Sequence, residues 1–436
     1  MKKLTAVKMG INGEGIAYDG RLPVFCTGAL PGEEILAEIT ETNERWMKAE
    51  TKKILKASEE HRESPCPYQN VCGGCGLLHM NYPAQLKAKK ELLAEALWKY
   101  GHVSRELIRE VHASAETLSY RSACKLPVQE ADGRLVTGMY MAGTNRFVPI
   151  EHCPAHTPEL ETMRLAVLDI LNKAQMKAYD ARKRRGVRYL VLRTINSHSQ
   201  LTLVTGRESI PDDVCDALFA LAGMDTVAQS VNTEKRGGIF GTACRILRGS
   251  ETIPAITGDI TLQLSPASFY QLNTKQADEL YRMAVQKINP CGRLIEVCCG
   301  IGGMSLLAKD KASEIIGVEY VPEAVENANA AAVYNHCDDH VRFVCGDAGE
   351  EFERLSAEKP FHTLLADPPR TGLDDRMLEA IKKYPPKRII YISCNPATLG
   401  RNLHFLKQCH YQVRTVIPYD LFPNSPHIES LTVLER

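Results

Sequence analysis

The sequence predicts an α/β protein in three parts: a small β-barrel at residues 1–57, an α+β centre at 58–265, and a Rossmann-like doubly wound sheet at 266–436. Three observations predict this fold class. Short strand-like runs separated by glycine turns fill the first part. Strand-like runs interrupted by one long helical pattern fill the second. Strands alternate regularly with helices in the third, which is the pattern of a doubly wound sheet.

The composition is that of an ordinary globular protein, with 44% hydrophobic and 24% charged residues in a chain of 436. No apolar run approaches the ~18 residues of a membrane span, and Met1 to Gly10 lack a signal-peptide core. We therefore expect a cytoplasmic monomer. The net charge is zero, so binding to a polyanion would depend on local basic groups. The sequence contains two: Lys48, Lys52, Lys53 and Lys56, and Arg182, Lys183, Arg184, Arg185 and Arg188.

The first part contains strand-like runs at 16–18, 23–25 and 35–39, each preceded or followed by glycine. A barrel of such short strands is a common nucleic-acid-binding scaffold. The second part begins with a polar, proline-marked linker at 58–67 and a helix at 83–100 that Gly101 ends. Its remaining elements are a helix at 158–178 and strands at 123–128, 135–141, 189–195 and 201–205.

The third part begins with a helix at 276–288. Its strands are expected at 293–297, 315–319, 341–344, 363–366 and 388–393, with helices between them such as 322–334 and 375–383. Parallel neighbours require such crossover helices. The last two runs, 412–418 and 428–434, are joined by a loop too short for one. We therefore expect these two strands to pair antiparallel.

Three strand ends in the third part carry groups suited to a nucleotide-like cofactor. Glu296-Val-Cys-Cys-Gly300-Ile-Gly302-Gly303 ends the first strand with glycines that allow close approach of a ligand. Glu319 ends the next strand, where an acidic side chain accepts hydrogen bonds from ribose hydroxyls, and Asp347 follows the third. The spacing fits either a nicotinamide dinucleotide or S-adenosylmethionine. The antiparallel final strands and the Asp367-Pro-Pro turn favour S-adenosylmethionine.

Two further strands end in reactive side chains, Asp367 and Cys394, which places a carboxylate and a thiol on one sheet edge. Asp367-Pro-Pro-Arg370 is similar to the turn of enzymes that methylate exocyclic amines, but Arg370 stands where an aromatic residue is usual. The thiol indicates a different target, carbon 5 of a pyrimidine. Addition of a thiolate to carbon 6 makes carbon 5 nucleophilic, and a base must then remove its proton. Glu429 is the nearest candidate base.

The fifteen cysteines stand in a chain without an export signal, so metal binding or catalysis is expected rather than a disulfide framework. Cys66, Cys72 and Cys75 form a close group, and Cys153 is the expected fourth ligand, ahead of His79 and His152. A site of four sulfur ligands suits zinc or an iron–sulfur cluster, and the spacing does not separate them.

Taken together, these motifs resemble the RNA uracil-5-methyltransferase family over nearly the whole chain. The run from Ser393 to Asn402 resembles the family's nucleophile motif, that from Phe422 to Ser430 its base motif, and that from Ser268 to Asn273 a motif close to the cofactor. The resemblance implies that Cys394 is the nucleophile and Glu429 the base. It also implies that six residues line the cofactor and pyrimidine pocket: Gln271, Cys298, Gly300, Glu319, Asp347 and Asp367.

The resemblance extends to the other two parts. The N-terminal barrel resembles the OB-like TRAM RNA-binding domain, and Cys66, Cys72, Cys75 and Cys153 resemble the [4Fe-4S] site of the 23S rRNA branch. The implied activity is S-adenosylmethionine-dependent methylation of carbon 5 of uridine in 23S rRNA through a cysteine adduct. A tRNA substrate, amine methylation and a non-catalytic iron–sulfur RNA-binding protein are the alternatives.

This sequence departs from the family pattern at three positions. Glu296 replaces the usual aspartate, Cys298 stands where an aromatic residue is common, and Gly303 stands where asparagine or aspartate is frequent. Contacts to adenosine at these positions are expected to come from the backbone.

Overall fold

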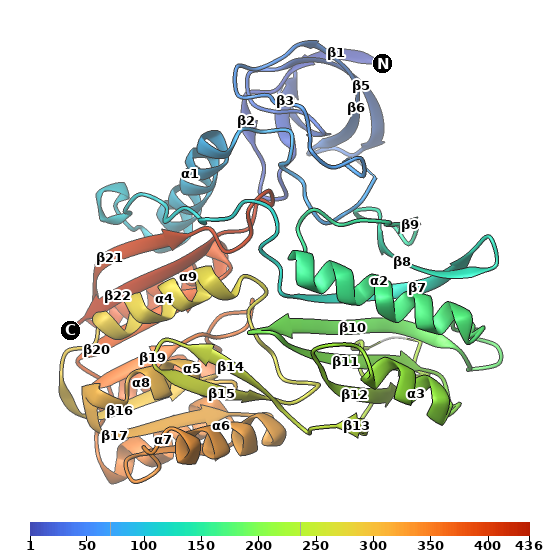
Figure 1. Cartoon of the computed structure of the whole chain (residues 1–436). Coiled ribbons are helices and arrows are strands. Elements are labelled where there is room, and N and C mark those ends of the chain that lie inside the picture. Colours follow the sequence, from blue (N-terminus) through green and yellow to red (C-terminus); the bar gives the residue numbers. More distant parts are fainter. Residues whose placement is uncertain (70, 236) are drawn as a thin grey trace.

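The computed structural model describes residues 1–69, 71–235 and 237–436. Figure 1 shows three bodies: a curled N-terminal sheet at the top, a central sheet with two helices at the right, and a C-terminal sheet flanked by helices at the left. This arrangement confirms the predicted fold class. Among the described residues, none of the helices combines the length and apolarity needed to traverse a lipid bilayer.

The N-terminal sheet is strand-rich, as predicted. Its strands are β1 (Lys2–Thr5), β2 (Lys8–Met9), β3 (Gly15–Asp19), β4 (Leu22–Thr27), β5 (Glu34–Thr42) and β6 (Met47–Lys56), in the order β1-β5-β6-β4-β3-β2. Alternation of side chains along β5 buries Ile35 and Ala37 on the inner face. These two residues pack with Val24 into a small separate core.

The central sheet has seven strands in the order β13-β12-β11-β10-β7-β8-β9. They are β7 (Ala123–Ala131), β8 (Arg134–Tyr140), β9 (Phe147–Pro149), β10 (Val187–Ile195), β11 (His198–Thr205), β12 (Met224–Val231) and β13 (Cys244–Gly249). Helices α2 (Pro158–Lys173) and α3 (Asp212–Phe219) pack on one face. The predicted helix at 158–178 ends five residues early, because Gln175 is left-handed (φ +54°) and Ala178 forms a β-bridge with Val187.

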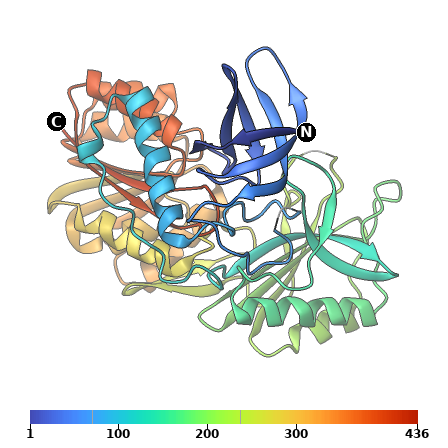
Figure 2. The same ribbon diagram turned by 90° about the horizontal axis from the view of Figure 1, so that it is seen from above.

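Two elements from the segment predicted as the centre pack with the C-terminal body instead. Helix α1 (Tyr82–Gly101) lies between the barrel and the C-terminal sheet in Figure 2 and shares a core with α9 (Pro396–Gln408). Gly101 permits this close approach, since a Cβ there would lie 2.9 Å from the carbonyl oxygen of Gly400. The hairpin of β14 (Ile253–Thr257) and β15 (Ile260–Leu264) likewise joins the C-terminal core.

The C-terminal sheet has the order β18-β17-β16-β19-β20-β22-β21. Its strands are β16 (Cys291–Val297), β17 (Ala312–Glu319), β18 (Val341–Cys345), β19 (Thr363–Ala366), β20 (Arg388–Ser393), β21 (Gln412–Tyr419) and β22 (Glu429–Glu435). The helices are α4 (Thr274–Gln286), α5 (Gly303–Leu307), α6 (Pro322–Tyr334), α7 (Ala348–Glu358), α8 (Asp375–Lys383) and α9. The first five strands are parallel, so their carboxyl ends meet at one edge.

The final two strands pair antiparallel, as predicted. The sequence did not predict that β22 inserts between β20 and β21. In this register Ser393, the last residue of β20, pairs with Ser430. The first residue of β22 therefore lies beside the carboxyl end of β20, and this places Glu429 next to Cys394.

Candidate active site

The carboxyl ends of the parallel strands border a cavity of about 970 Å³. The strand order reverses direction between β16 and β19, which is the position where open α/β sheets bind ligands. The cavity is lined by all eight residues that the sequence predicted for catalysis and cofactor binding: Gln271, Cys298, Gly300, Glu319, Asp347, Asp367, Cys394 and Glu429. The structure thus brings together residues that are spread over more than a third of the chain.

The loop between β16 and α5 has an unusual backbone. Gly300 and Gly302 have φ angles of +55° and +82°, and Cys298 has +57°. A Cβ on Gly302 would lie 2.4 Å from the ring of Phe343, so this position needs glycine for space as well as for φ. Cys298 adopts a conformation that is uncommon for a residue with a side chain and that concentrates at functional sites. The loop therefore presents its backbone to the cavity.

Glu319 and Asp347 are held at strand ends by backbone donors. The Glu319 carboxylate accepts hydrogen bonds from Gly300 N at 2.9 Å and from the two backbone amides that follow it, at 2.9 and 3.0 Å. Asp347 accepts one from Glu350 N at 3.0 Å and caps α7. Both carboxylates border the cavity, where they can accept hydrogen bonds from ligand hydroxyl or amino groups.

Glu296 is bound by the protein's own backbone. Its carboxylate is 2% exposed and accepts hydrogen bonds from the amide and the hydroxyl of Ser305, the former at 2.7 Å. Burial raises the pKa of Glu296 to about 8, and the two Ser305 hydrogen bonds oppose that rise. The longer side chain at this departure from the family pattern therefore helps to fix the glycine loop from its inner side.

Cys394, Glu429 and Asp367 form a group of acids that lines the cavity, with Glu429 buried and the other two half-buried. Burial, followed by the charges of Glu429 and Asp367, raises the pKa of the Cys394 thiol to about 11. Burial also raises the pKa of Asp367 to about 7. Glu429 is 4% exposed, and burial beside Asp367 raises its pKa well above the ordinary value. The group therefore has a strong affinity for protons.

Sequence reasoning gave no role to three other residues that line this cavity, Arg370, Phe422 and His427. The positive charge of Arg370 lowers the pKa of both Cys394 and Glu429 and so partly offsets their burial. Its backbone carbonyl accepts a hydrogen bond from Asn395 Nδ2 at 3.0 Å, which ties the turn after β19 to the turn after β20. The sequence indicated a role for Arg370 only through its position three residues after Asp367 in the same turn.

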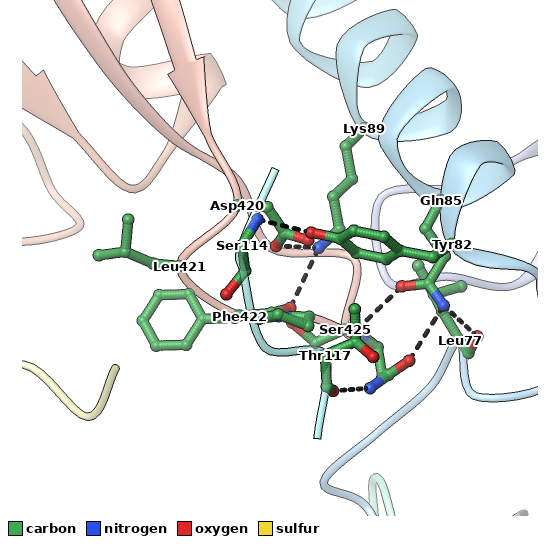
Figure 3. Close-up of polar contacts among 12 residues, drawn as sticks. Leu77, Tyr82, Gln85, Lys89, Ser114, Thr117, Asp420, Leu421, Phe422 and Ser425 are labelled. Atoms are coloured by element: carbon green, nitrogen blue, oxygen red, sulfur yellow. Dashed lines mark hydrogen bonds and ion pairs between the residues drawn. The ribbon is translucent and has the colours of Figure 1, made fainter. Parts of the chain in front are cut away.

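Side chains of helix α1 form polar contacts with the segment that carries Phe422 and His427 and fix its position (Figure 3). Lys89 Nζ donates to Asp420 Oδ1 at 2.6 Å and to the carbonyl of Phe422 at 3.0 Å, and both charged side chains are fully buried. Burial lowers the pKa of Lys89, and the Asp420 carboxylate opposes that shift. This ion pair fixes the start of the segment that leads to Glu429.

The same segment has a second anchor. Gln85, also buried on α1, accepts a hydrogen bond from Asn424 N at 2.9 Å and donates to Asn424 Oδ1 at 3.0 Å (Figure 3). Asn424 Nδ2 donates in turn to the carbonyl of Thr117 at 2.6 Å. Asn424 has φ +64°, a conformation that asparagine adopts more readily than most residues. Residues 420–424 are therefore positioned by a helix more than 300 residues away in sequence.

The four cysteines predicted as metal ligands, Cys66, Cys72, Cys75 and Cys153, line a second cavity of about 340 Å³. Burial, together with the other three thiols and against the opposing charge of Arg121, raises the pKa of Cys75 to about 11. Among the described residues, which omit Asn70, no three His, Cys, Asp or Glu side chains are arranged to hold a metal ion. The predicted cluster stays a prediction. Residues 268–271 border both cavities.

The sheet order, the antiparallel final strands and the cavity at the strand ends are the features from which the sequence predicted an S-adenosylmethionine-dependent methyltransferase. The family model of the tRNA (uracil-5-)-methyltransferases matches residues 81–436. The chain therefore belongs to this family of RNA methyltransferases, which confirms the resemblance drawn from the sequence.

Known proteins match the whole chain. An uncharacterized RNA methyltransferase of Bacillus cereus is 34% identical over 99% of this chain and 96% of its own length. One of Halalkalibacterium halodurans is 32% identical over 99% of this chain and 95% of its own length. Among solved structures, the tRNA (uracil-54, C5)-methyltransferase of Pyrococcus abyssi in complex with S-adenosyl-L-homocysteine matches with a TM-score of 0.80 and 24% identity, covering 99% of both chains. That likeness establishes the fold from end to end.

Proposed function

We propose that this protein methylates carbon 5 of a uridine in RNA through a covalent bond between Cys394 and carbon 6 of the uracil. The observation that carries this proposal is the shared cavity. A thiol, two carboxyls and the glycine loop line one space of about 970 Å³, so a nucleophile, a proton acceptor and a cofactor loop would border the same volume.

The proposed steps use the chain's own residues as follows. The Cys394 thiolate adds to carbon 6, and the electron pair of the carbon 5–carbon 6 double bond makes carbon 5 nucleophilic. The bound cofactor supplies the methyl group. Glu429 then accepts the carbon 5 proton, and the carbon 6–sulfur bond breaks to return the thiolate and restore the double bond. The raised pKa of Glu429 increases its affinity for that proton.

The remaining lining residues divide between the two ligands. We propose that Gly300, Glu319, Asp347 and the backbone at Cys298 bind S-adenosylmethionine, because they surround the glycine loop. Gln271 and Asp367 would bind the uracil edge. Gln271 is directed by a hydrogen bond from its Nε2 to the hydroxyl of Tyr281 at 3.4 Å.

The test is covalent trapping with RNA that contains 5-fluorouridine. Fluorine leaves no proton for Glu429 to remove, so wild-type protein should form a complex with this RNA and S-adenosylmethionine that survives denaturation. Cys394→Ala should form none. On ordinary RNA, Glu429→Gln should accumulate the methylated adduct, whereas Cys394→Ala should not. An adduct of equal yield in Cys394→Ala would overturn the mechanism, and methylation retained by that variant would favour an amine target at Asp367-Pro-Pro.

For the substrate we propose 23S rRNA, as the barrel and the cysteine set imply by resemblance. A specific observation favours tRNA as the second candidate. The Pyrococcus abyssi enzyme, described as a tRNA methyltransferase, covers 99% of this chain, so the possession of an N-terminal barrel does not separate the two substrates. Trapping with 5-fluorouridine transcripts of 23S rRNA and of tRNA, in parallel, decides between them.

We further propose that Cys66, Cys72, Cys75 and Cys153 hold a [4Fe-4S] cluster with a structural role, since four thiolates leave no open iron position. The support is that all four cysteines line one cavity. Anaerobically purified protein should contain iron and sulfide. Cys75→Ser should lose both, and Cys345→Ser, at an exposed cysteine outside the site, should keep them. Zinc without sulfide in the wild-type protein would contradict the proposal.

The predicted domain boundaries at residues 57 and 265 separate two N-terminal parts from the part that would carry the active site, and we infer that these two parts bind the RNA. We propose that the barrel and the central sheet hold the folded RNA while the target uridine turns out of its stack into the cavity.

A further inference from the structure

One face of the central sheet is left open by its helices. Cross-strand pairs place Tyr189, Val191 and Arg193 of β10 on the same face as Pro127, Lys125 and Ala123 of β7. The intervening residues, such as Leu190, Leu192 and Leu126, pack in the core under α2 and α3. On this face Lys125 is exposed, Tyr140 is 37% exposed and Tyr189 is half-buried, whereas Val191 and Arg193 are buried. This face therefore presents aromatic and cationic groups to solvent.

The aromatic side chains of this face pack against a second ring or a guanidinium group. Tyr140 pairs with Phe147 across β8 and β9, with ring centroids 6.2 Å apart in an edge-on arrangement. The Arg188 guanidinium lies 5.8 Å from the Tyr189 ring centroid. Its Nη1 donates to the Asn232 and Glu234 carbonyls, at 3.2 and 2.8 Å, so Arg188 is a fixed support for the ring.

The hairpin that precedes β10 supplies unpaired positive charge. Residues 181–185 are exposed at its tip, and β-bridges of Ala178 with Val187 and of Asp180 with Arg185 close it. Among the ion pairs between described residues, Lys183 pairs with Asp180 at 3.9 Å, and Arg182, Arg184 and Arg185 have none. In the other basic group predicted from the sequence, Lys48 and Lys52 pair with glutamates at 2.6–3.2 Å, and Lys53 and Lys56 have no ion pair with a described residue.

Strand β10 runs from this hairpin toward the C-terminal body (Figure 1). Its start at Val187 follows the basic tip, and Arg193 near its end donates a hydrogen bond to the Ser268 carbonyl at 2.6 Å. Residue 268 lines the catalytic cavity, as does Phe269, which is 68% exposed. An extended strand rises about 3.3 Å per residue, so the six steps from Val187 to Arg193 span roughly 20 Å. The exposed part of this face, from the hairpin tip to Tyr189, therefore lies on the strand whose far end, at the buried Val191 and Arg193, contacts a residue that lines the catalytic cavity.

We propose that this face, formed by Tyr140, Tyr189, Lys125 and the hairpin tip 182–185, binds the single-stranded RNA that flanks the target uridine. Bases stack on the two tyrosines, and phosphates pair with Lys125 and the tip. Stacking on aromatic rings and pairing of phosphates with cations are the two interactions by which proteins hold unpaired RNA. The inference rests on the proposed function, since it assigns the path by which RNA reaches that cavity.

The experiment measures binding of a short fluorescein-labelled single-stranded RNA of mixed sequence by fluorescence anisotropy, using the full-length protein over a series of salt concentrations. Tyr189→Ala and Tyr140→Ala should each weaken binding roughly fivefold to a hundredfold, as expected for one lost stacking contact. Tyr189→Phe should bind like wild type. Arg182→Gln with Arg185→Gln should lower the slope of log affinity against log salt by about 1.4, or about 0.7 per lost phosphate contact.

Matched controls lie away from the face. Tyr334→Ala removes a 60% exposed tyrosine of α6, and Lys173→Gln removes an exposed cation of α2, on the covered side of the sheet. If the Tyr140, Tyr189 and tip variants bind RNA as these controls do, the proposal is wrong. Tyr140 and the residues of the hairpin tip are exposed, so their variants should stay folded. These variants therefore test the proposal even if Tyr189→Ala unfolds. Failure of wild-type protein to form the Cys394 adduct would refute the proposed function alone, because RNA binding is measured without it.

Discussion

Replacement of Lys89 by methionine should show how the segment before Glu429 is held. The Lys89 ammonium and the Asp420 carboxylate are both fully buried and lie 2.6 Å apart, and the ammonium also donates to the Phe422 carbonyl at 3.0 Å. Lys89→Met keeps the apolar stem of the side chain but leaves a buried carboxylate without its cation. It also removes the donor to Phe422, a residue that lines the catalytic cavity.

The expected loss of stability follows from the burial of the pair. Removal of one partner of a buried ion pair costs about 3–5 kcal/mol, since the remaining charge is uncompensated. For a unit of this size each kcal/mol lowers the unfolding midpoint by roughly 2–4 °C, so Lys89→Met should unfold about 6–20 °C below wild type. Adduct formation should also slow, because Phe422 and the segment leading to Glu429 lose an anchor.

Thermal unfolding and the rate of adduct formation on 5-fluorouridine RNA are measured side by side, at a temperature where both proteins are folded. The control is Lys89→Met combined with Asp420→Leu, which removes both charges. Apolar replacement of a whole buried pair is often neutral or stabilising, so the midpoint should recover while the adduct still forms slowly. The reasoning is refuted if Lys89→Met unfolds within about 2 °C of wild type. Full recovery of the adduct rate in the double variant would show that the anchor to Phe422 is dispensable.

Two further predictions concern the cavity itself. Alkylation of Cys394 by iodoacetamide in the free protein should accelerate about tenfold per pH unit from pH 7 to 10, because only the thiolate reacts and burial raises its pKa to about 11. Arg370→Gln should slow this alkylation, because it removes the positive charge that lowers the pKa of Cys394. A plateau of the alkylation rate near pH 8.5 would contradict both statements. Gly302→Ala should weaken binding of S-adenosylhomocysteine, measured by calorimetry, about tenfold or more, because φ is +82° and the new Cβ would lie 2.4 Å from Phe343. Gly303→Ala is the matched control, since its Cβ would meet other atoms only at 3.7 Å, and equal affinities of the two variants would disprove the steric argument.

Local patterns in the sequence predicted much of the C-terminal sheet. Helix 322–334 and strand 388–393 coincide with α6 and β20, because a proline begins the helix and an apolar run bounded by turn residues defines the strand. The helix predicted at 158–178 was wrong at its end, since the long-range bridge between Ala178 and Val187 competes with helical hydrogen bonds. A pattern within one segment does not contain such a pairing.

The candidate site divides in the same way. Residues at the ends of parallel strands, such as Asp367 and Cys394, were predictable because all carboxyl ends of a parallel sheet meet at one edge. Glu429 was predictable only through its motif, because its place beside Cys394 depends on the insertion of β22 between β20 and β21. Lys89 carried no signal, since a lysine in an amphipathic helix usually lies in solvent.

The sequence by itself determined the family and eight of the residues that border the cavity at the strand ends, because strand-end residues and short motifs are local features. The tertiary structure alone decided that helix α1 supports the segment before Glu429 and that β10 joins a basic hairpin to the cavity at the strand ends. Each of these depends on contacts between segments far apart in the chain. Such contacts are fixed by the packing of whole elements, which no local pattern records.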